Sequence, residues 1–329
     1  MRKVSTKKIT SIGGSALIEG IMMPGPKRTT VCVRTGENEI YSEDIKITTI
    51  PEKCKLFKLP LLRGIAGLID SMRLSYKSLM LSADKAVEAG EVEEEEPSKF
   101  EKWLDEKFGD KLVKVIMVFA SILGVALAVA LFFFLPSFLF DLTANVVPVF
   151  QGNGESAVFW KSVFEGVLKI ALFLGYIVLC SQMTEMKRVF MYHGAEHKTI
   201  FCYENEEELT VENVRKQIRF HPRCGTSFMV LMLIVGIVIG LFIPVAPFGI
   251  GFLRPVFKIL LLPVSCGIGY ELIKICGKHD NAFTRVIAAP GLWAQRITTK
   301  EPDDKMIEVA IEAMKAVIPD DGTDIINNK

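Results

Sequence analysis

The feature that most constrains this chain is an apolar run of 26 residues, 115–140, that contains no charged side chain. A helix needs about 20 apolar residues to cross the hydrocarbon core of a bilayer, so this run is long enough to span a membrane. Half of all residues are hydrophobic and the mean hydropathy is +0.33, yet 23% of the residues are charged. This combination predicts a membrane protein that also has hydrophilic segments.

Three weaker apolar segments predict further spans. They cover residues 158–180, 227–243 and 255–275. The last two could instead form a shallow re-entrant hairpin, and the sequence leaves that alternative open. Charged groups inside a bilayer are costly and are usually paired. We therefore expect Glu165 of the second segment to pair with Lys169, one turn away, or with Lys258 of the fourth segment across the helix bundle.

Charges in the connecting segments predict the orientation of the spans. The connection 141–157 contains no Lys or Arg, whereas the connection 181–226 contains seven. Because basic loops tend to remain on the cytoplasmic side, we expect both termini and residues 181–226 to be cytoplasmic. The four histidines, at positions 193, 197, 221 and 279, then lie on the same side of the membrane. The chain is thus expected to be a multi-pass membrane protein.

The remaining segments predict a small α+β layer on the cytoplasmic side. Residues 28–48 contain two β-branched runs around Thr-Gly-Glu-Asn, which is typical of a β-hairpin. Residues 60–89 predict one long amphipathic helix, whose apolar stripe either packs under the soluble layer or lies in the membrane interface. Pro302 and Asp303 predict the start of a C-terminal helix. Its apolar face comprises Met306, Ile307, Ala310, Ile311, Met314 and Val317.

The predicted fold class is therefore mainly α and integral to the membrane, with about four transmembrane helices and this small cytoplasmic layer. Six segments follow one another along the chain. They are an N-terminal hairpin with its amphipathic helix (1–90), an acidic linker (91–111), the first two spans (112–180), a cytoplasmic loop (181–226), the last two spans (227–276) and a cytoplasmic C-terminal segment (277–329).

The candidate site begins with the sequence His-Gly-Ala-Glu-His at residues 193–197. This is H-x-x-E-H, the inverted form of the zincin helix motif. Positions four apart share one face of a helix, so His193 and His197 could bind the same ion. In enzymes of that kind the glutamate, here Glu196, acts as the general base toward the attacking water. The pattern is short and Gly194 weakens a helix, so side chains that only form hydrogen bonds are the competing interpretation.

A second group of candidate ligands follows in the same loop. His221 and Cys224 form an H-x-x-C pair, 24 residues after His197. The intervening residues predict a strand, an acidic turn and a short helix capped near Thr210, which is enough chain to bring the two groups together. Imidazole and thiolate ligands suit zinc or another divalent transition metal. Four such ligands would form a closed structural site, whereas three ligands with an open position would form a catalytic one.

Further candidates are spare ligands or groups that support the ligands from outside. They are Glu19, Cys202, Arg223, His279 and Asp280. A ligating histidine usually donates its other N–H to a carboxylate, which is why Asp280 is included. Lys198 and Arg219, together with Arg223, could instead hold an anionic lipid head group at the inner leaflet. Membrane lipids are therefore expected partners, while a net charge of +1 provides no basic field for nucleic acid.

Four stretches of the chain resemble the recurring motifs of a known family. They are GGSALIEGIMMPGP (13–26), HGAEHK (193–198), HPRCGTSF (221–228) and APGLWAQRITTKEP (289–302). The first has paired glycines but no Gly-Lys-Ser/Thr, so we expect an irregular loop rather than a P-loop. Over nearly its whole length the chain is similar to the YqhQ-like family of bacterial multi-pass membrane proteins. That family is a domain of unknown function whose members are often labelled predicted metal-dependent enzymes.

The resemblance implies a location in the bacterial cell membrane and leaves two functional hypotheses. In the first, the protein is a metal-dependent hydrolase at the cytoplasmic membrane face. Glu196 is then the general base, and the metal ligands are His193, His197, and His221 or Cys224. In the second, it is a non-catalytic accessory protein that binds and regulates other integral membrane machinery such as the Sec translocon, and the same motif clamps loops together. The first hypothesis requires that the two groups of candidate ligands meet.

Overall fold

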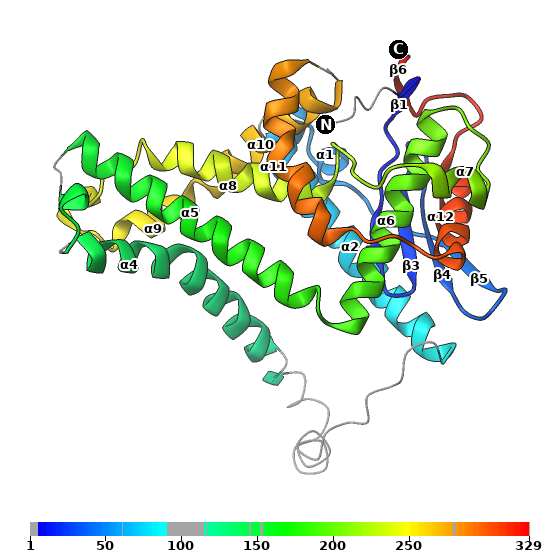
Figure 1. Ribbon diagram of the computed structural model, residues 1–329, viewed down its shortest axis with the longest axis horizontal. Helices are drawn as coiled ribbons and strands as arrows, with labels where there is room; N and C mark the ends of the chain where they lie inside the picture. Colours follow the sequence, from blue (N-terminus) through cyan, green and yellow to red (C-terminus); the bar gives the residue numbers. More distant parts are fainter. Residues whose placement is uncertain are drawn as a thin grey trace, which may run out of the picture. The chain divides into compact units, whose positions relative to one another are not determined.

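The computed structural model describes residues 6–60, 62–90, 115–116, 118–144, 146–151, 154–278 and 281–328 (Figure 1). This part of the chain is mainly helical and contains two small antiparallel sheets. The chain divides into two compact units. Unit 1 comprises Met1–Val92, Phe173–Val235 and Pro263–Lys329, and unit 2 comprises Glu93–Leu172 and Gly236–Leu262.

A four-stranded antiparallel sheet forms the core of unit 1. Its strands, in spatial order, are β2 (Ser15–Leu17), β3 (Gly20–Pro24), β4 (Thr29–Arg34) and β5 (Ile40–Asp44). The hairpin predicted at 28–48 is present as β4 and β5, with Val33 opposite Tyr41. The irregular loop expected at 13–26 is instead a second hairpin, β2–β3, whose turn holds Glu19 at a φ of 50°. The predicted hairpin is thus one half of a larger sheet.

The two faces of this sheet pack against different helices, because side chains alternate along a strand. On one face lie α6 (Thr184–Glu204) and α12 (Asp304–Val317), and α2 (Leu62–Glu88) lies on the other (Figure 1). The core under α6 and α12 includes Ile21, Met23, Cys32, Tyr192, Met306, Ala310 and Met314. The core under α2 includes Leu17, Met22, Val31, Val33, Ile45 and Leu74.

The C-terminal segment contains the predicted helix and one further strand. α12 starts after Asp303, whose carboxylate accepts a hydrogen bond from the backbone N–H of Met306 at 2.9 Å. The predicted apolar face of α12 is buried. Beyond it, β6 (Ile325–Asn328) pairs with β1 (Lys8–Thr10), so residues from the two ends of the chain lie side by side.

The amphipathic helix predicted at 60–89 is α2, but its large apolar side chains face away from the sheet. The side that is buried carries mostly small residues, which are Gly64, Ala66, Asp70, Leu74, Ser78, Ser82 and Ala86. Small side chains allow the helix to approach the sheet closely, and Ser82 Oγ donates to the backbone carbonyl of Ile18 in the β2–β3 turn. Five residues of the predicted apolar stripe, Ile69, Met72, Tyr76, Leu79 and Met80, are therefore exposed rather than packed under the soluble layer, while Leu62, Ile65 and Leu68 are half-buried.

The segment 181–226 is largely helical. α6 continues as far as Glu204, so the strand expected after His197 is wrong. After an acidic turn, α7 (Val211–Lys216) is capped as predicted by Thr210, whose side chain accepts from the backbone N–H of Asn213 at 3.3 Å. The helices α8 (Gly225–Gly240), α10 (Leu262–Lys278) and α11 (Ala282–Thr298) follow along the chain. Short helical turns are α1 (Ile50–Lys53), η1 (Lys55–Lys58), η3 (Pro148–Gln151) and η4 (Pro247–Gly249).

Two helices match the first two predicted spans. The first is Val118–Ala144, in which a π-helical segment, η2 (Ala130–Phe134), precedes α4 (Leu135–Ala144). The second is α5 (Glu155–Cys180). Both are long and apolar enough to cross a membrane.

The third and fourth predicted spans are less regular. The third corresponds to α8, whose 16 residues reach about 24 Å, less than the roughly 30 Å of a hydrocarbon core. The fourth is divided into α9 (Leu253–Leu260) and α10, with a bend of 46° between them. The described part of the chain therefore has two helices that could cross a membrane, or three if the bent pair forms one span.

Unit 2 buries a cluster of charged side chains from α5 and α9. Glu165 forms an ion pair with Lys258, which confirms the pairing predicted across the bundle. Arg254 lies beside them, with its Nε 3.5 Å from a carboxylate oxygen of Glu165. The same guanidinium donates to backbone carbonyls at the end of α8, including that of Gly240 at 3.1 Å. Lys169 does not pair with Glu165.

Candidate metal centre

Helix α6 presents two histidines whose ring orientation is fixed by backbone carbonyls. The Nδ1–H of His193 donates to the carbonyl oxygen of Thr298 at 2.9 Å, and the Nδ1–H of His197 donates to that of Arg219 at 2.6 Å. Because a carbonyl oxygen can only accept, the proton of each neutral ring is assigned to Nδ1. The lone pair of each ring is therefore on Nε2. Metal-binding histidines are oriented by hydrogen bonds of this kind.

Cys224 lies where these two nitrogens point. Its Sγ is 3.1 Å from Nε2 of His193, and it accepts from the backbone N–H of Thr226 at 3.4 Å. Ligand atoms of His193, His197 and Cys224 all lie within 4.8 Å of one another. Two imidazoles and a thiol at this spacing are the donor set that zinc prefers. The two groups of ligands expected to meet do meet in unit 1.

His197 shows most clearly that the cluster is arranged for a ligand. Its ring is 1% exposed, and Nε2 makes no hydrogen bond. Burial lowers the pKa of His197 to about 4, so the ring is neutral at pH 7. A buried polar atom without a partner costs about 1–3 kcal/mol, so such atoms are rare unless something else binds them. A neutral imidazole with a free lone pair is the form that binds a metal ion.

Glu196 lies beside the cluster but is not one of its three ligand groups. Its carboxylate is buried, and Oε2 has no hydrogen-bond partner. Burial raises the pKa of Glu196 to about 8, and the nearby His193 opposes that rise. Gly14, which precedes β2, closes over this side chain: a Cβ at Gly14 would lie 2.6 Å from Glu196 Cγ. Of the paired glycines in the first motif, Gly14 is therefore needed for close approach to Glu196, whereas a Cβ at Gly13 would meet nothing within 4 Å.

Gly194 has a similar role on the neighbouring side of α6. A Cβ at this position would overlap the carbonyl oxygen of Lys300. The segment after α11 crosses α6 here, and the backbone N–H of Lys300 donates to the carbonyl of Phe190 at 2.8 Å. This crossing also places the Thr298 carbonyl at His193. The glycine was expected to weaken the helix, but α6 is continuous and the residue serves packing.

His221 was a predicted ligand, and the structure places it next to the cluster rather than in it. Its ring centre is 5.5 Å from that of His197. Its Nδ1 accepts from the backbone N–H of Arg223 at 3.3 Å, and its Nε2 faces Glu204 at 3.9 Å. Of the H-x-x-C pair, therefore, only Cys224 contributes to the cluster. The spacing of that pair in the sequence does not reveal which member faces inward.

Gln295 of α11 holds the loop that carries Cys224, and the sequence did not identify it. Its side-chain oxygen accepts from the backbone N–H of His221 at 2.7 Å. Its Nε2 donates to the carbonyl of His221 at 2.6 Å and to Ser227 Oγ at 2.9 Å. The residue is fully buried. In the sequence, the only indication of this role was that Gln295 is a polar amide within the fourth motif.

The spare candidates are engaged elsewhere. Glu19 accepts hydrogen bonds from Arg188 and, at 3.2 Å, from the hydroxyl of Tyr192. Cys202 is buried near the carbonyls of the acidic turn, and burial raises its pKa to about 11. Arg223 donates to Glu204 and to the carbonyl of Thr10. None of the three is in the His–Cys cluster, and His279 and Asp280 lie outside the described residues.

The basic residues considered for a lipid head group are paired within the protein. Lys198 is 2.7 Å from Glu301, and Arg219 forms an ion pair with the same carboxylate. Arg223 pairs with Glu204, as above. Each cation already has a carboxylate partner, so this group of side chains does not form a free basic pocket. The interpretation as a head-group site is not supported.

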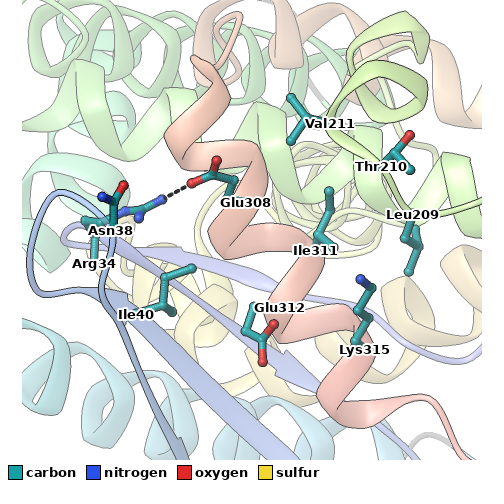
Figure 2. Close-up of a pocket in the computed structure, with 10 residues that line it drawn as sticks. All are labelled: Arg34, Asn38, Ile40, Leu209, Thr210, Val211, Glu308, Ile311, Glu312 and Lys315. Carbon is teal, nitrogen blue, oxygen red and sulfur yellow. Dashed lines mark hydrogen bonds and ion pairs between the residues drawn. The ribbon is translucent and has the colours of Figure 1, made fainter.

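An open surface pocket lies elsewhere in unit 1, between the β4–β5 hairpin, residues 209–211 and α12 (Figure 2). Part of its charged lining is paired, since Arg34 donates to Glu308 at 2.8 Å and to the carbonyl of Lys305 at 2.6 Å. The residues that line it include no His and no Cys. This pocket offers no ligands of the kind found in the His–Cys cluster, which is therefore the candidate site.

The four sequence motifs converge on this cluster although they are spread over nearly 300 residues of the chain. The first motif contributes Gly14, the second the two histidines and Glu196, and the third Cys224. The fourth contributes Gln295 and Thr298. All of these residues belong to unit 1.

Comparisons with known proteins match most of the chain. A family model described as "Protein of unknown function (DUF1385)" matches residues 59–320, which include the three cluster ligands, Glu196 and Gln295. "Uncharacterized protein YqhQ" of Bacillus subtilis (strain 168) is 34% identical over 308 residues, which make up 93% of this chain and 92% of that protein. No solved structure gives a significant match.

Proposed function

The chain belongs to the DUF1385 family, and from the geometry of its own site we propose that it is a metal-dependent hydrolase associated with the membrane. The observation that carries this proposal is the buried, unpartnered Nε2 of His197, which faces His193 and Cys224. The residues fit a zinc-type ion in charge, softness and orientation. His193, His197 and Cys224 would hold it. A bound ion would supply Lewis-acid activation of water at neutral pH.

Glu196 would act as the general base. Its Oε2 is buried and has no hydrogen-bond partner. Efficient proton transfer needs a base whose pKa lies near the working pH; burial raises the pKa of Glu196, and a bound cation would favour its ionised form. Glu196 Oε2 would accept a proton from water and later return it to the leaving group. Three protein ligands leave a coordination position open, which is typical of catalytic rather than structural zinc.

We place the protein in the bacterial cell membrane as a multi-pass chain, with both termini and residues 181–226 on the cytoplasmic side. Two helices of sufficient length and hydropathy support insertion. The seven Lys and Arg of residues 181–226, against none in 141–157, support the orientation. The short α8 and the bend between α9 and α10 favour a re-entrant pair over two complete spans.

A second candidate function is that of a non-catalytic accessory protein for other integral membrane machinery such as the Sec translocon. The observation that favours it is the burial of the site. His197 is 1% exposed and Glu196 4%, and Gly14 covers the glutamate. A metal ion there would join α6 to the loop that carries Cys224, as a structural clamp does. In this role Glu196 would have no chemical task.

Cobalt spectroscopy tests the metal centre. Purified full-length protein in detergent is titrated with Co²⁺, and we expect a near-ultraviolet band from thiolate-to-cobalt charge transfer. Cys224→Ser should remove that band, and His193→Ala or His197→Ala should weaken binding by about 10–100-fold or more. His221→Ala is the matched control and should retain the band. Loss of the band in His221→Ala, or no band in the unmodified protein, would contradict this ligand set.

Glu196→Gln separates the two functions. If the protein is an enzyme, the zinc-loaded form should hydrolyse an activated ester such as p-nitrophenyl acetate. Glu196→Gln should then keep the cobalt spectrum but lose about 10²–10⁴-fold in rate. If the zinc-loaded protein and the variant hydrolyse the ester equally, the accessory role is favoured.

A further inference from the structure

The outer face of α2 and the segment before it carry large apolar side chains that no part of the described chain covers. They are Leu56, Leu59, Ile69, Met72, Tyr76, Leu79 and Met80, each between 42% and 69% exposed. Those within α2 follow helical spacing and lie on one face, opposite the small residues that pack on the sheet. Soluble proteins rarely expose a contiguous apolar strip of this kind without using it for binding.

The same segment is strongly basic. Residues 53–80 contain six Lys and Arg but one acidic residue, Asp70. Asp70 is buried, where it accepts from the backbone N–H of Ile50 at 2.8 Å and pairs with Arg73. Within the described chain, four lysines of this segment form no ion pair: Lys53, Lys55, Lys58 and Lys77. The exposed apolar strip is therefore bordered by uncompensated positive charge.

The start of α2 is fixed beside an apolar helix. Gly64 packs so closely on α10 that a Cβ there would lie 2.8 Å from Tyr270 Cβ. Arg63 Nε donates to Glu271 of α10 at 2.6 Å. α10 is one half of the bent apolar pair that could cross or enter a membrane. The exposed strip of α2 thus begins next to a helix that is itself suited to lipid.

From these observations we propose that α2 is an interfacial helix that binds anionic lipid. Its strip of large apolar side chains enters the boundary of the acyl chains, and the lysines of residues 53–77 contact lipid phosphates. Helices that lie in the membrane interface combine these two features. Residues 53–59 place three lysines among leucine and phenylalanine side chains, which favours a lipid surface over a protein groove. This proposal rests on membrane insertion but not on the metal centre.

A fluorescent amino acid inserted by amber suppression tests the contact in the full chain. Position 76 is the main site and position 72 is the second. Position 315, on α12 across the sheet from α2, is the control. Position 131, in the first candidate span, reports insertion itself. The protein is reconstituted in phosphatidylcholine vesicles with and without phosphatidylglycerol, and the probe is quenched by nitroxide-labelled acyl chains or by iodide in the water.

We expect acyl-chain nitroxides to reduce the emission at positions 76 and 72 by about twofold or more, with little quenching by iodide. Position 315 should show the reverse. Phosphatidylglycerol should increase the quenching by acyl-chain nitroxides. This increase should be smaller in the double variant Lys55→Gln, Lys58→Gln. Iodide quenching at position 76 would mean a solvent-exposed strip and would overturn the proposal. Protection from both quenchers would mean that protein covers the strip, which also overturns it. Lack of lipid quenching at position 131 would instead contradict membrane insertion.

Discussion

Each unit of this protein buries ionisable side chains, and the two groups differ in how their polar atoms are satisfied. In unit 2, Glu165 lies between two cations, and the two atoms without a hydrogen bond, Glu165 Oε1 and Arg254 Nε, form an ion pair with each other at 3.5 Å. In unit 1, His197 Nε2 and Glu196 Oε2 have no partner. Buried atoms of opposite charge that face each other compensate part of the cost of their burial, whereas the unit 1 atoms have no such partner and are available to a ligand. We therefore interpret the unit 2 cluster as structural and the unit 1 cluster as the functional site.

The largest effect should come from breaking the unit 2 cluster. Glu165→Leu leaves Lys258 and Arg254 buried without their carboxylate, and we expect a loss of about 3–5 kcal/mol in the free energy of unfolding. Denaturant unfolding in detergent micelles measures it. Glu165→Leu combined with Lys258→Leu should recover part of the loss, because one of the unpaired charges is also removed. A loss below about 1 kcal/mol, as for an exposed ion pair, would mean that solvent reaches these groups.

Zinc should stabilise the protein through unit 1 alone. At a free zinc concentration about 100 times the dissociation constant, the free energy of unfolding should rise by about 2.7 kcal/mol. The increment should vanish in Cys224→Ser but persist in Glu165→Leu, since that residue has no part in the metal centre. Thermal unfolding with zinc and with a chelator measures it. An equal increment in Cys224→Ser would remove the thiol from the ligand set.

A side chain added at Gly194, next to the metal centre, should lower the free energy of unfolding by a somewhat smaller amount. Gly194→Ala places a methyl group on the Lys300 carbonyl, and overpacking of this kind costs about 1–3 kcal/mol. It should also weaken Co²⁺ binding, because the crossing segment carries the carbonyl that orients His193. Gly225→Ala is the matched control: a Cβ added to this helical glycine would meet no other segment of the described chain within 4 Å, so the change should be tolerated. Equal losses in the two variants would argue against the crossing contact.

The smallest effect should be that of Lys169→Met. Lys169 Nζ lies over the ring of Phe133, 4.5 Å from its centre, and forms no ion pair in the described part of the chain. We expect a change of less than about 1 kcal/mol, which is typical of a cation–π contact. The same unfolding assay measures it. A loss as large as that of Glu165→Leu would mean that Lys169 belongs to the charge cluster after all.

Local patterns predicted several elements correctly. The cap at Asp303 and the apolar spacing of the C-terminal helix gave α12, and the β-branched runs around residues 35–38 gave β4 and β5. Other patterns misled. The run after His197 contains β-branched and aromatic residues and was expected to be a strand, but the buried face of α6 requires those side chains in a helix. The first motif forms β2 and β3, and β3 pairs with β4, a contact that no local sequence pattern predicts.

For the candidate site, two histidines four apart on a helix were enough to predict a shared metal ligand face. The choice between His221 and Cys224 was not available, because it depends on how Gln295 of a distant helix holds their loop. The contribution of Gly14 and Thr298 was equally hidden. Each acts through its backbone, and contacts made by backbone atoms can seldom be predicted from the type of residue at that position.

The sequence by itself determined which segments are apolar enough for a membrane, where the charge lies, and which side chains share a face of one helix. These properties follow from composition and from helical and strand periods, which are local. The tertiary structure alone decided which face is covered. It directed the large apolar side chains of α2 away from the sheet and brought Cys224 rather than His221 to the histidines. Such choices depend on close packing between elements far apart in the chain. The free energy gained when a side chain is buried depends on the side chains that it packs against, which the local sequence pattern does not specify.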